Sequence, residues 1–300
     1  MRTLGINISH NASICQVTDG KVDFYYEEDR FNKKKYFIPT REDCYFKSIE
    51  KHVKEKPDHV ITASFDRSLD TYEDLFNEDV IISEKIGEQL GTKVKFYKSN
   101  HHLYHAYTGF HLSKFDNAIV VVMDGGGAQV VPMYQEVESI YLMDEMNCER
   151  KYVHCTTDRF NNIYKMNNDS EKHFFDNTTE YFLSGRKSCG MAFADMCIEL
   201  GYENGGHDAG KLMGLASYSD HPEPHKLQQR TKEYTIKLLE KAISYSNCKN
   251  IILSGGYALN CVNNYHYVKA FPDYNFFVDP IAHDGGTSMG AALWMYNEKK

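Results

Sequence analysis

Two histidines spaced four residues apart are the side chains of this sequence best suited to metal chemistry. They lie in the segment His101-His102-Leu103-Tyr104-His105-Ala106, which follows a predicted strand and is expected to begin a helix. Residues i and i+4 share one face of a helix, so the imidazoles of His101 and His105 could bind one cation. Histidines with this spacing also cap or pack helices, and the spacing alone leaves that alternative open.

Two acidic residues favour the metal interpretation. Asp124 ends a continuous apolar run at 118–123, and Asp284 precedes Gly285-Gly286. Loops at the carboxyl ends of strands in an α/β sheet meet at one crevice, so both carboxylates could face the histidines. Two imidazoles and a carboxylate suit a divalent first-row metal such as Fe(II), Mn or Zn, and the sequence does not choose among them.

Glycine clusters follow three predicted strands. They are Gly125-Gly126-Gly127, Gly255-Gly256 and Gly285-Gly286. Glycine lets backbone N–H groups approach phosphate oxygens closely, so the clusters together predict a nucleotide site. Neither G-x-x-x-x-G-K-[ST] nor G-x-G-x-x-G occurs, which removes the usual support for P-loop and Rossmann folds.

The expected elements describe an α/β protein. Strands are predicted at 3–8, 13–17, 22–26, 59–64, 94–97, 118–123, 250–254 and 276–278, with helices near 42–55 and 79–90 and a long one from Pro224. The first three strands should form an antiparallel meander around the Asp19-Gly20 turn. We therefore predict an N-terminal half at 1–134, an irregular insertion at 135–187 and a C-terminal half at 188–300.

The order of these elements resembles the actin/Hsp70/sugar-kinase (ASKHA) superfold. An N-terminal meander, a strand ending in Asp-Gly-Gly-Gly and a late strand ending in Gly-Gly match its phosphate-1, phosphate-2 and adenosine elements. The predicted fold class is accordingly α/β, with two similar halves around a nucleotide cleft.

Composition limits the classes of function. The 300 residues include 42% hydrophobic and 25% charged ones, as in ordinary globular proteins, and the net charge of −8 does not favour binding to a phosphate backbone. Eight cysteines include no C-x-x-C pair, which indicates reduced thiols. The longest apolar run is far shorter than the roughly 20 residues that span a bilayer, and no signal peptide is evident. A cytoplasmic protein without a membrane partner is expected.

Seven ordered motifs resemble the O-carbamoyltransferases of the NodU/CmcH and tobramycin-carbamoylating type. Their large domain is similar to the tRNA threonylcarbamoyl-transfer protein TsaD. The motifs are Leu4-Gly5-Ile6 with His10-Asn11-Ala12-Ser13, Glu27-Glu28-Asp29-Arg30-Phe31 with Lys35 and Pro39, His101 to Ala106, Asp124 to Gly127, Gly210-Lys211-Leu212-Met213-Gly214-Leu215-Ala216, Gly255 to Cys261, and Asp284 to Ala292.

The resemblance implies a role for each matching residue. It implies that His101, His105 and Asp284 are metal ligands, conventionally for iron, and that Asp124 is an acid near the metal and the phosphates. It implies that the nucleotide-binding residues, which contact phosphate and adenosine, are Gly125, Gly126, Gly127, Gly255, Gly256 and Asn260, and that Lys211 lines the cleft. It also implies that His10 and Lys35 lie near the carbamoyl group or the acceptor. Lys35 could instead belong to the solvated run Lys33-Lys34-Lys35, and His10 could be a structural loop histidine.

Two departures from the family pattern affect details. Asn11 stands where the family usually has aspartate, and Ala128 where it usually has glutamate. Family members also carry a YrdC-like domain that makes carbamoyl-adenylate from carbamoyl phosphate and ATP. No such half is visible here, so we expect a separate YrdC-like protein to supply the adenylate, or a different activation chemistry.

The expected function is carbamoyl transfer from carbamoyl-adenylate to a hydroxyl group. The acceptor could belong to a small molecule, a sugar, or a hydroxymethylated pyrimidine in a nucleotide or DNA, so nucleic acid enters only as a substrate. His10 is the candidate general base, and the sequence shows no convincing Ser-His-Asp or nucleophilic cysteine signature. Threonylcarbamoyl transfer and a non-catalytic nucleotide-binding subunit are the alternatives.

Overall fold

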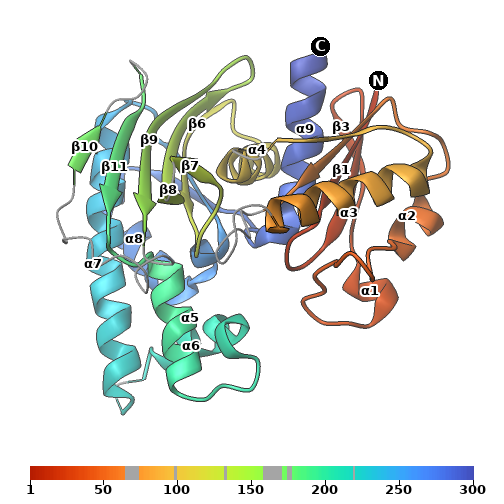
Figure 1. Ribbon diagram of the computed structural model, residues 1–300. Coiled ribbons are helices and arrows are strands. Elements are labelled where there is room, and N and C mark those ends of the chain that lie inside the picture. Colours follow the sequence, from red (N-terminus) through yellow and green to blue (C-terminus); the bar gives the residue numbers. More distant parts are fainter. Residues whose placement is uncertain (65–73, 98–99, 132–133, 158–170, 174–177, 219) are drawn as a thin grey trace. The chain divides into compact units, whose positions relative to one another are not determined.

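A computed structural model describes residues 1–64, 74–97, 100–131, 134–157, 171–173, 178–218 and 220–300 (Figure 1). The chain forms two compact units. Unit 1 comprises residues 1–108 and 283–300, and unit 2 comprises residues 109–282. The chain therefore leaves unit 1 once and returns to it for its last helix.

Unit 1 contains a mixed sheet of five strands among its described residues, in the order β3-β2-β1-β4-β5. The strands are β1 (Arg2–Asn7), β2 (Ser13–Thr18), β3 (Lys21–Glu27), β4 (His59–Ala63) and β5 (Val94–Phe96). β1, β2 and β3 pair antiparallel, which confirms the predicted meander, and β4 and β5 extend it in parallel.

The helices of unit 1 cover this sheet and deliver the histidines. They are α1 (Asp29–Asn32), α2 (Lys47–His52), α3 (Asp74–Leu90) and α9 (Thr287–Lys299), with α4 (His101–Ser113) running from unit 1 into unit 2. α9 packs on β1, β2 and β4 (Figure 1). A Cβ atom at Gly290 would lie 1.8 Å from the carbonyl oxygen of Tyr104, so glycine is required where α9 meets α4.

Unit 2 contains a larger sheet of eight strands among its described residues. Seven follow the order β10-β11-β9-β8-β6-β12-β13, and the eighth, β7, pairs with β8. Their bounds are β6 (Asn117–Met123), β7 (Gln129–Val131), β8 (Tyr134–Asp144), β9 (Cys148–Thr156), β10 (Glu171–His173), β11 (Glu180–Ser184), β12 (Asn250–Ser254) and β13 (Asn275–Val278).

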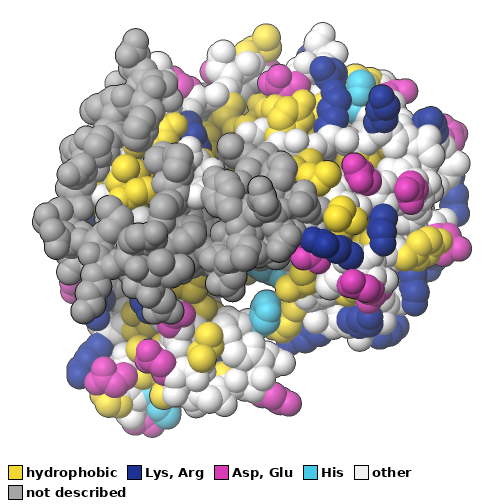
Figure 2. Space-filling view, in the orientation of Figure 1, with side chains coloured by type: hydrophobic (Ala, Val, Ile, Leu, Met, Phe, Trp, Pro, Cys, Tyr) yellow, Lys and Arg dark blue, Asp and Glu magenta, His cyan; other side chains and the backbone are white. Residues whose placement is uncertain are grey.

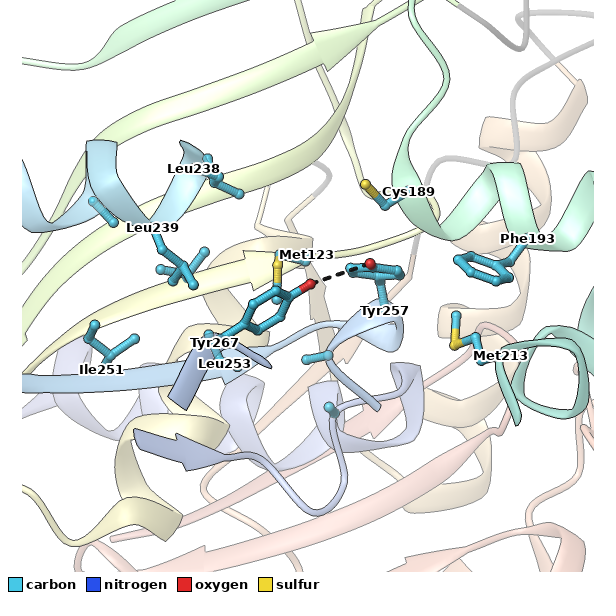
Figure 3. Close-up of a cluster of buried hydrophobic side chains, with 14 of the residues drawn as sticks. Met123, Cys189, Phe193, Met213, Leu238, Leu239, Ile251, Leu253, Tyr257 and Tyr267 are labelled. Carbon is cyan, nitrogen blue, oxygen red and sulfur yellow. Dashed lines mark hydrogen bonds between the residues drawn. The ribbon is translucent and has the colours of Figure 1, made fainter. Parts of the chain in front are cut away.

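The core of unit 2 lies between this sheet and α5 (Cys189–Glu199), α6 (Ala209–Leu215), α7 (Pro222–Ser244) and α8 (Cys261–Ala270). Figure 3 shows Met123 of β6 beside Tyr257 and Tyr267, whose hydroxyl oxygens lie 3.5 Å apart. Phe193 and Met213 extend the same cluster. The end of β6, which Asp124 follows, is thus anchored in apolar packing.

The predicted irregular insertion at 135–187 differs from the structure. Its described residues include β8, β9 and β11, which continue the sheet of unit 2 beyond β6. The buried side chains of β8 include Gln135, Glu136, Glu138 and Ser139, so the strand lacks the apolar alternation by which strands are recognised.

The boundaries of the two halves also differ from the prediction. Residues 109–134 belong to unit 2 rather than to an N-terminal half, and residues 283–300 belong to unit 1 rather than to a C-terminal half. The reason is that α9 buries its apolar side chains, including Ala291 and Met295, against Ile61 and Ala63 of β4.

The surface carries charges of both signs. Figure 2 shows lysine and arginine side chains interspersed with aspartate and glutamate on the described part of the face it draws. Across the described residues, no helix has the length and apolarity needed to cross a membrane.

Candidate metal centre and glycine turns

Three side chains of unit 1 direct donor atoms at one point. The Nε2 atoms of His101 and His105 lie 3.2 Å apart. One carboxylate oxygen of Asp284, Oδ1, lies 3.7 Å from Nε2 of His101 and 3.9 Å from Nε2 of His105. All three side chains are buried, with at most 4% of the side chain exposed. The structure therefore brings together the three predicted metal ligands.

The donor set fits a first-row divalent metal ion. A point equidistant from the three donor atoms lies about 2.1 Å from each, which agrees with metal–nitrogen and metal–oxygen bonds of about 2.0–2.2 Å. Two imidazoles and one carboxylate leave further coordination positions open. Two buried Nε2 atoms at this separation, both facing a carboxylate, form an arrangement that a shared cation stabilises.

Hydrogen bonds fix the short turn that carries Asp284. This short 3-10 helix, η4 (Asp284–Gly286), directly precedes α9. The hydroxyl of Thr108 on α4 donates to the carbonyl of Gly286 at 2.7 Å, and the hydroxyl of Ser13 on β2 donates to the carbonyl of Gly285 at 2.6 Å. The helix of the histidines is thus tied directly to the turn of the aspartate.

His10 lies at the edge of this cluster. Its Nε2 is 3.3 Å from Oδ2 of Asp284, its Nδ1 is 2.9 Å from Oδ1 of Asn11, and 30% of its side chain is exposed. Asn11 adopts a left-handed backbone conformation with φ of 58°, which asparagine tolerates better than most residues. The predicted base therefore contacts both a metal-ligand candidate and solvent.

Sequence reasoning missed Ser9. Its single hydroxyl hydrogen is shared between two acceptors, Oδ2 of Asp284 at 2.8 Å and Oδ1 of Asn7 at 2.7 Å. Ser9 thus orients the aspartate from the end of β1. Its position directly before His10 was the available signal, but serine is too common in loops for that signal to stand out.

A second cluster that the sequence did not reveal adjoins the turn of Asp284. The Tyr25 hydroxyl donates to Oε1 of Glu27 at 3.2 Å, and Nε2 of His283 lies 3.4 Å from the same oxygen. The hydrogen bond from His283, opposed by burial, lowers the pKa of the Glu27 carboxyl.

Lys35 occupies an exposed position. Its ammonium group lies 4.5 Å from the ring centroid of Tyr36. The segment nevertheless runs beside the loop of His10, since the Ala12 N–H donates to the carbonyl of Phe37 at 3.1 Å. A role of Lys35 toward the carbamoyl group stays a prediction.

In unit 2, Asp124 joins two glycine turns. Its Oδ1 accepts hydrogen bonds from the N–H of Gly125 at 2.8 Å and the N–H of Gly256 at 3.1 Å. Gly255 has φ of 85°, and a Cβ atom there would lie 2.3 Å from the carbonyl oxygen of Met123, so only glycine fits. The glycine turns that follow β6 and β12 therefore lie side by side. A single nucleotide site formed by both turns, as predicted from the sequence, requires this proximity.

Several of these amides already have acceptors inside the protein. Besides Gly125 and Gly256, the N–H of Gly127 donates to the carbonyl of Glu136 at 2.8 Å. The side-chain amide of Gln135 donates to the carbonyl of Gly127 at 2.5 Å, and Gly126 packs against Gln135. The glycines thus allow close approach of the backbone, while a contact of these turns with phosphate stays a prediction.

Two further predicted residues of unit 2 have partners within the protein. Lys211 on α6 is largely exposed and forms an ion pair with Asp208 at 2.8 Å. Asn260 is 1% exposed, and its amide exchanges hydrogen bonds of 2.8 and 3.1 Å with that of Gln228. The amide of Asn260 therefore faces α7 in this structure.

Ser188 is a residue of this region that the sequence did not single out. Its hydroxyl caps α5 by accepting from the N–H of Met191 at 2.9 Å, and it donates to the carbonyl of Gly125 at 2.7 Å. Ser188 thereby links the start of α5 to the turn after β6.

Comparisons with known proteins relate this chain to carbamoyltransferases. The family model described as "Carbamoyltransferase N-terminus" matches residues 225–293. The nodulation protein NolNO of Sinorhizobium fredii is 22% identical over 96% of this chain and 46% of its own length. An uncharacterized protein of Methanocaldococcus jannaschii is 26% identical over 97% of this chain and 56% of its own length. The chain thus spans about half the length of these relatives, and the matches support a relationship to carbamoyltransferases.

Solved structures establish the fold. Full-length HypF in a phosphate- and nucleotide-bound form superposes with a TM-score of 0.57 at 12% identity, over 98% of this chain and 55% of its own. The activator of 2-hydroxyisocaproyl-CoA dehydratase from Clostridium difficile, with bound ADPNP, gives 0.51 at 10% identity, over 99% and 95%. A ROK hexokinase from Thermus thermophilus gives 0.52 at 14% identity, over 100% of both chains. The chain has an ASKHA-type α/β fold, as predicted.

Proposed function

We propose that this chain transfers a carbamoyl group from carbamoyl-adenylate to a hydroxyl acceptor. The observation that carries the proposal is the convergence of His101, His105 and Asp284, with His10 beside the aspartate. The similarity to carbamoyltransferases supports the transferred group. The fold supports a nucleotide donor, since structurally similar proteins were solved with nucleotides bound.

His101, His105 and Asp284 would hold a divalent first-row metal, for which Fe(II) is our proposal. When bound, such an ion supplies Lewis acidity that stabilises negative charge developing on a carbonyl oxygen. Ser9 keeps the carboxylate of Asp284 oriented through its 2.8 Å hydrogen bond. Burial of all three ligands excludes water from their surroundings, which strengthens electrostatic interactions there.

His10 is the proposed general base. With its Nδ1 held by Asn11, its Nε2 can take the proton of an acceptor hydroxyl. The hydroxyl oxygen then attacks the carbamoyl carbon, the bond from that carbon to the phosphate oxygen breaks, and a carbamate ester and AMP result. Asn11 supplies an amide oxygen where a carboxylate would hold the imidazole more strongly, so a modest turnover rate is expected.

Unit 2 is proposed to bind the adenylate. Gly125, Gly126, Gly127, Gly255 and Gly256 form the turns that a phosphate would approach, and Asp124 holds two of these turns together. Lys211 is a candidate for a phosphate contact because its side chain is largely exposed, with its ammonium group paired to Asp208. Asn260 would support this site indirectly, by fixing the start of α8.

The experiment uses the purified chain supplied with Fe(II) and synthetic carbamoyl-adenylate. Sugars, small alcohols and hydroxymethylated pyrimidine nucleotides are offered as acceptors, and mass spectrometry detects the gain of one carbamoyl unit. We expect His10→Ala to slow transfer by about 10²–10⁴, the usual effect of a general base. His221→Ala, a change at an exposed position of unit 2, is the matched control and should transfer at the wild-type rate.

Two results would contradict the proposal. A near wild-type rate for His10→Ala at saturating adenylate would place the base elsewhere. Absence of product with every acceptor, while the nucleotide still binds, would favour a non-catalytic nucleotide-binding subunit.

A further inference from the structure

A serine, a histidine and a glutamate line up across three adjacent strands of unit 2. Nε2 of His154 on β9 lies 2.7 Å from Oγ of Ser184 at the end of β11. Nδ1 of the same ring is hydrogen bonded to Oε2 of Glu138 on β8. β8, β9 and β11 are neighbours in the sheet (Figure 1), and Glu138 is the register partner of His154. This is the arrangement of a nucleophile, a base and an orienting acid.

The charge state of Glu138 fixes the tautomer of His154. Burial opposes ionisation of Glu138, but His154 and Arg186 offset it and lower the pKa of the carboxyl below its ordinary value. An ionised carboxylate only accepts hydrogen bonds, so Nδ1 of His154 carries the hydrogen. Nε2 then faces the hydroxyl of Ser184 at 2.7 Å and can accept its hydrogen. The serine is thus oriented for deprotonation.

Neighbouring groups balance the charge of this cluster. The guanidinium of Arg186 lies 3.9 Å from Oε2 of Glu138 and 3.2 Å from Nδ1 of His154, and it stacks 3.6 Å over the ring of Tyr234. The Tyr234 hydroxyl donates to the same carboxylate oxygen at 3.3 Å. The opposite charges of Glu138 and Arg186 thus lie beside the imidazole that faces Ser184.

Within this cluster Ser184 is 6% exposed, and Arg186 is the member that reaches solvent. The side chain of Arg186 is 41% exposed, whereas those of Glu138 and His154 are almost completely buried. Two residues after Arg186, Ser188 donates to the carbonyl of Gly125. The segment that carries the serine thus leads directly to the turn proposed to approach phosphate.

We propose that Ser184 is a nucleophile that accepts acyl groups from small activated carbonyl compounds. The favoured substrate class is an acyl phosphate, because Arg186 adjoins the serine and Ser188, in the same segment, bonds to the turn after β6; this choice of leaving group rests on the proposed function. His154 is the base, and Glu138 is a positioning residue that acts through His154.

The step balances without a further reagent. Oγ of Ser184 bonds to the carbonyl carbon, the bond from that carbon to the phosphate oxygen breaks, and the serine proton passes through Nε2 of His154 to the departing phosphate. Water then attacks the acyl carbon and gives a proton to Nε2 of His154, the bond from Oγ to that carbon breaks, and His154 returns the proton to Oγ. The products are a carboxylic acid and phosphate, and the serine hydroxyl is restored.

The test uses the full chain without nucleotide, metal or acceptor. The probes are a fluorophosphonate, p-nitrophenyl acetate and acetyl phosphate, which differ in size and leaving group. We expect a fluorophosphonate adduct at Ser184 by mass spectrometry, and release of p-nitrophenol and phosphate from the other two. Ser184→Ala should lose the adduct and both hydrolyses. Ser217→Ala, which changes an exposed serine that follows α6 and is bonded to the carbonyl of Gly214, should keep them.

A second variant tests Glu138 separately from folding. Glu138→Gln should lower kcat for p-nitrophenyl acetate by about 10²–10⁴ and leave KM unchanged, as expected when an orienting carboxylate is lost. A purely structural role would not produce this division between kcat and KM. Wild-type protein that reacts with none of the three probes would overturn the proposal, as would a reaction that persists in Ser184→Ala. Because carbamoyl transfer is assayed with metal and adenylate, failure of either proposal is recognised separately.

Discussion

Replacing Asn260 by alanine should destabilise the folded protein. The side chain is 1% exposed and its amide exchanges two hydrogen bonds with Gln228, which is itself 2% exposed. The same amide oxygen caps α8 by accepting from the N–H of Asn263 at 3.2 Å. A residue in this position stabilises the junction of α7 and α8 whether or not a nucleotide is bound.

The expected loss follows from these contacts. A lost helix cap costs about 1 kcal/mol, and the partner amide of Gln228, left buried without its bonds, costs about 1–3 kcal/mol. The free energy of unfolding should therefore fall by about 2–4 kcal/mol. With a urea dependence of about 3 kcal/mol per molar for a chain of this size, the urea midpoint should fall by about 1 M.

Urea unfolding followed by circular dichroism measures this loss. Asn264→Ala is the matched control, because its amide makes one partly buried hydrogen bond, to the carbonyl of Ala258 at 2.7 Å, and should cost about 1 kcal/mol. A double-mutant cycle with Gln228→Ala should give a coupling energy of about 0.5–3 kcal/mol. An unchanged midpoint for Asn260→Ala, together with weaker nucleotide binding, would refute this reasoning and favour the direct contact that the sequence motif implies.

Three further changes test other parts of the structure. His105→Ala should lose most of the bound metal, measured by elemental analysis, whereas His111→Ala on the same helix should keep it; full occupancy in both would remove the assigned ligands. Gly255→Ala should lower the free energy of unfolding by at least about 2 kcal/mol, because a Cβ atom there would lie 2.3 Å from a carbonyl oxygen of β6. Gly91 also has a positive φ but has open space around it, so Gly91→Ala should cost about 1 kcal/mol. Equal losses for the two variants would contradict the steric argument. Because the pKa of Glu138 is lower in the folded protein than its ordinary value of 4.5, its stabilising contribution is present above that pH and is lost as pH falls through the folded-state value. The difference in unfolding free energy between wild type and Glu138→Gln should therefore narrow as the pH falls below 4.5, and a difference independent of pH would contradict the assigned charge.

Local sequence signals predicted the parts of the fold that local interactions determine. The Asp19-Gly20 turn predicted the meander of β1 to β3, and the apolar run at 118–123 predicted β6. The helical pattern from Pro224 predicted α7. In each case the deciding residues lie within a few positions of one another, so no knowledge of the tertiary structure was needed.

The strands between 135 and 187 escaped prediction because their burial depends on partners elsewhere. Glu136 is fully buried, and the guanidinium of Arg150 on β9 lies 3.2 Å from its carboxylate. Glu138 is buried because His154 and Tyr234 pair with it. A pattern of hydrophobic residues cannot reveal strands whose buried faces contain compensated charges.

The two candidate sites of this protein differ in the same way, since one is formed by neighbouring residues of a helix and the other by residues from separate strands. His101 and His105 could be recognised from the sequence because a helix brings residues i and i+4 together without any help from the fold. His154 follows Glu138 by 16 residues and precedes Ser184 by 30 residues. These three side chains meet only through the register of β8, β9 and β11. A shift of one residue in that register would turn one of these side chains to the opposite face of the sheet. A catalytic group distributed across strands is therefore specified by strand pairing, and only the folded chain displays it.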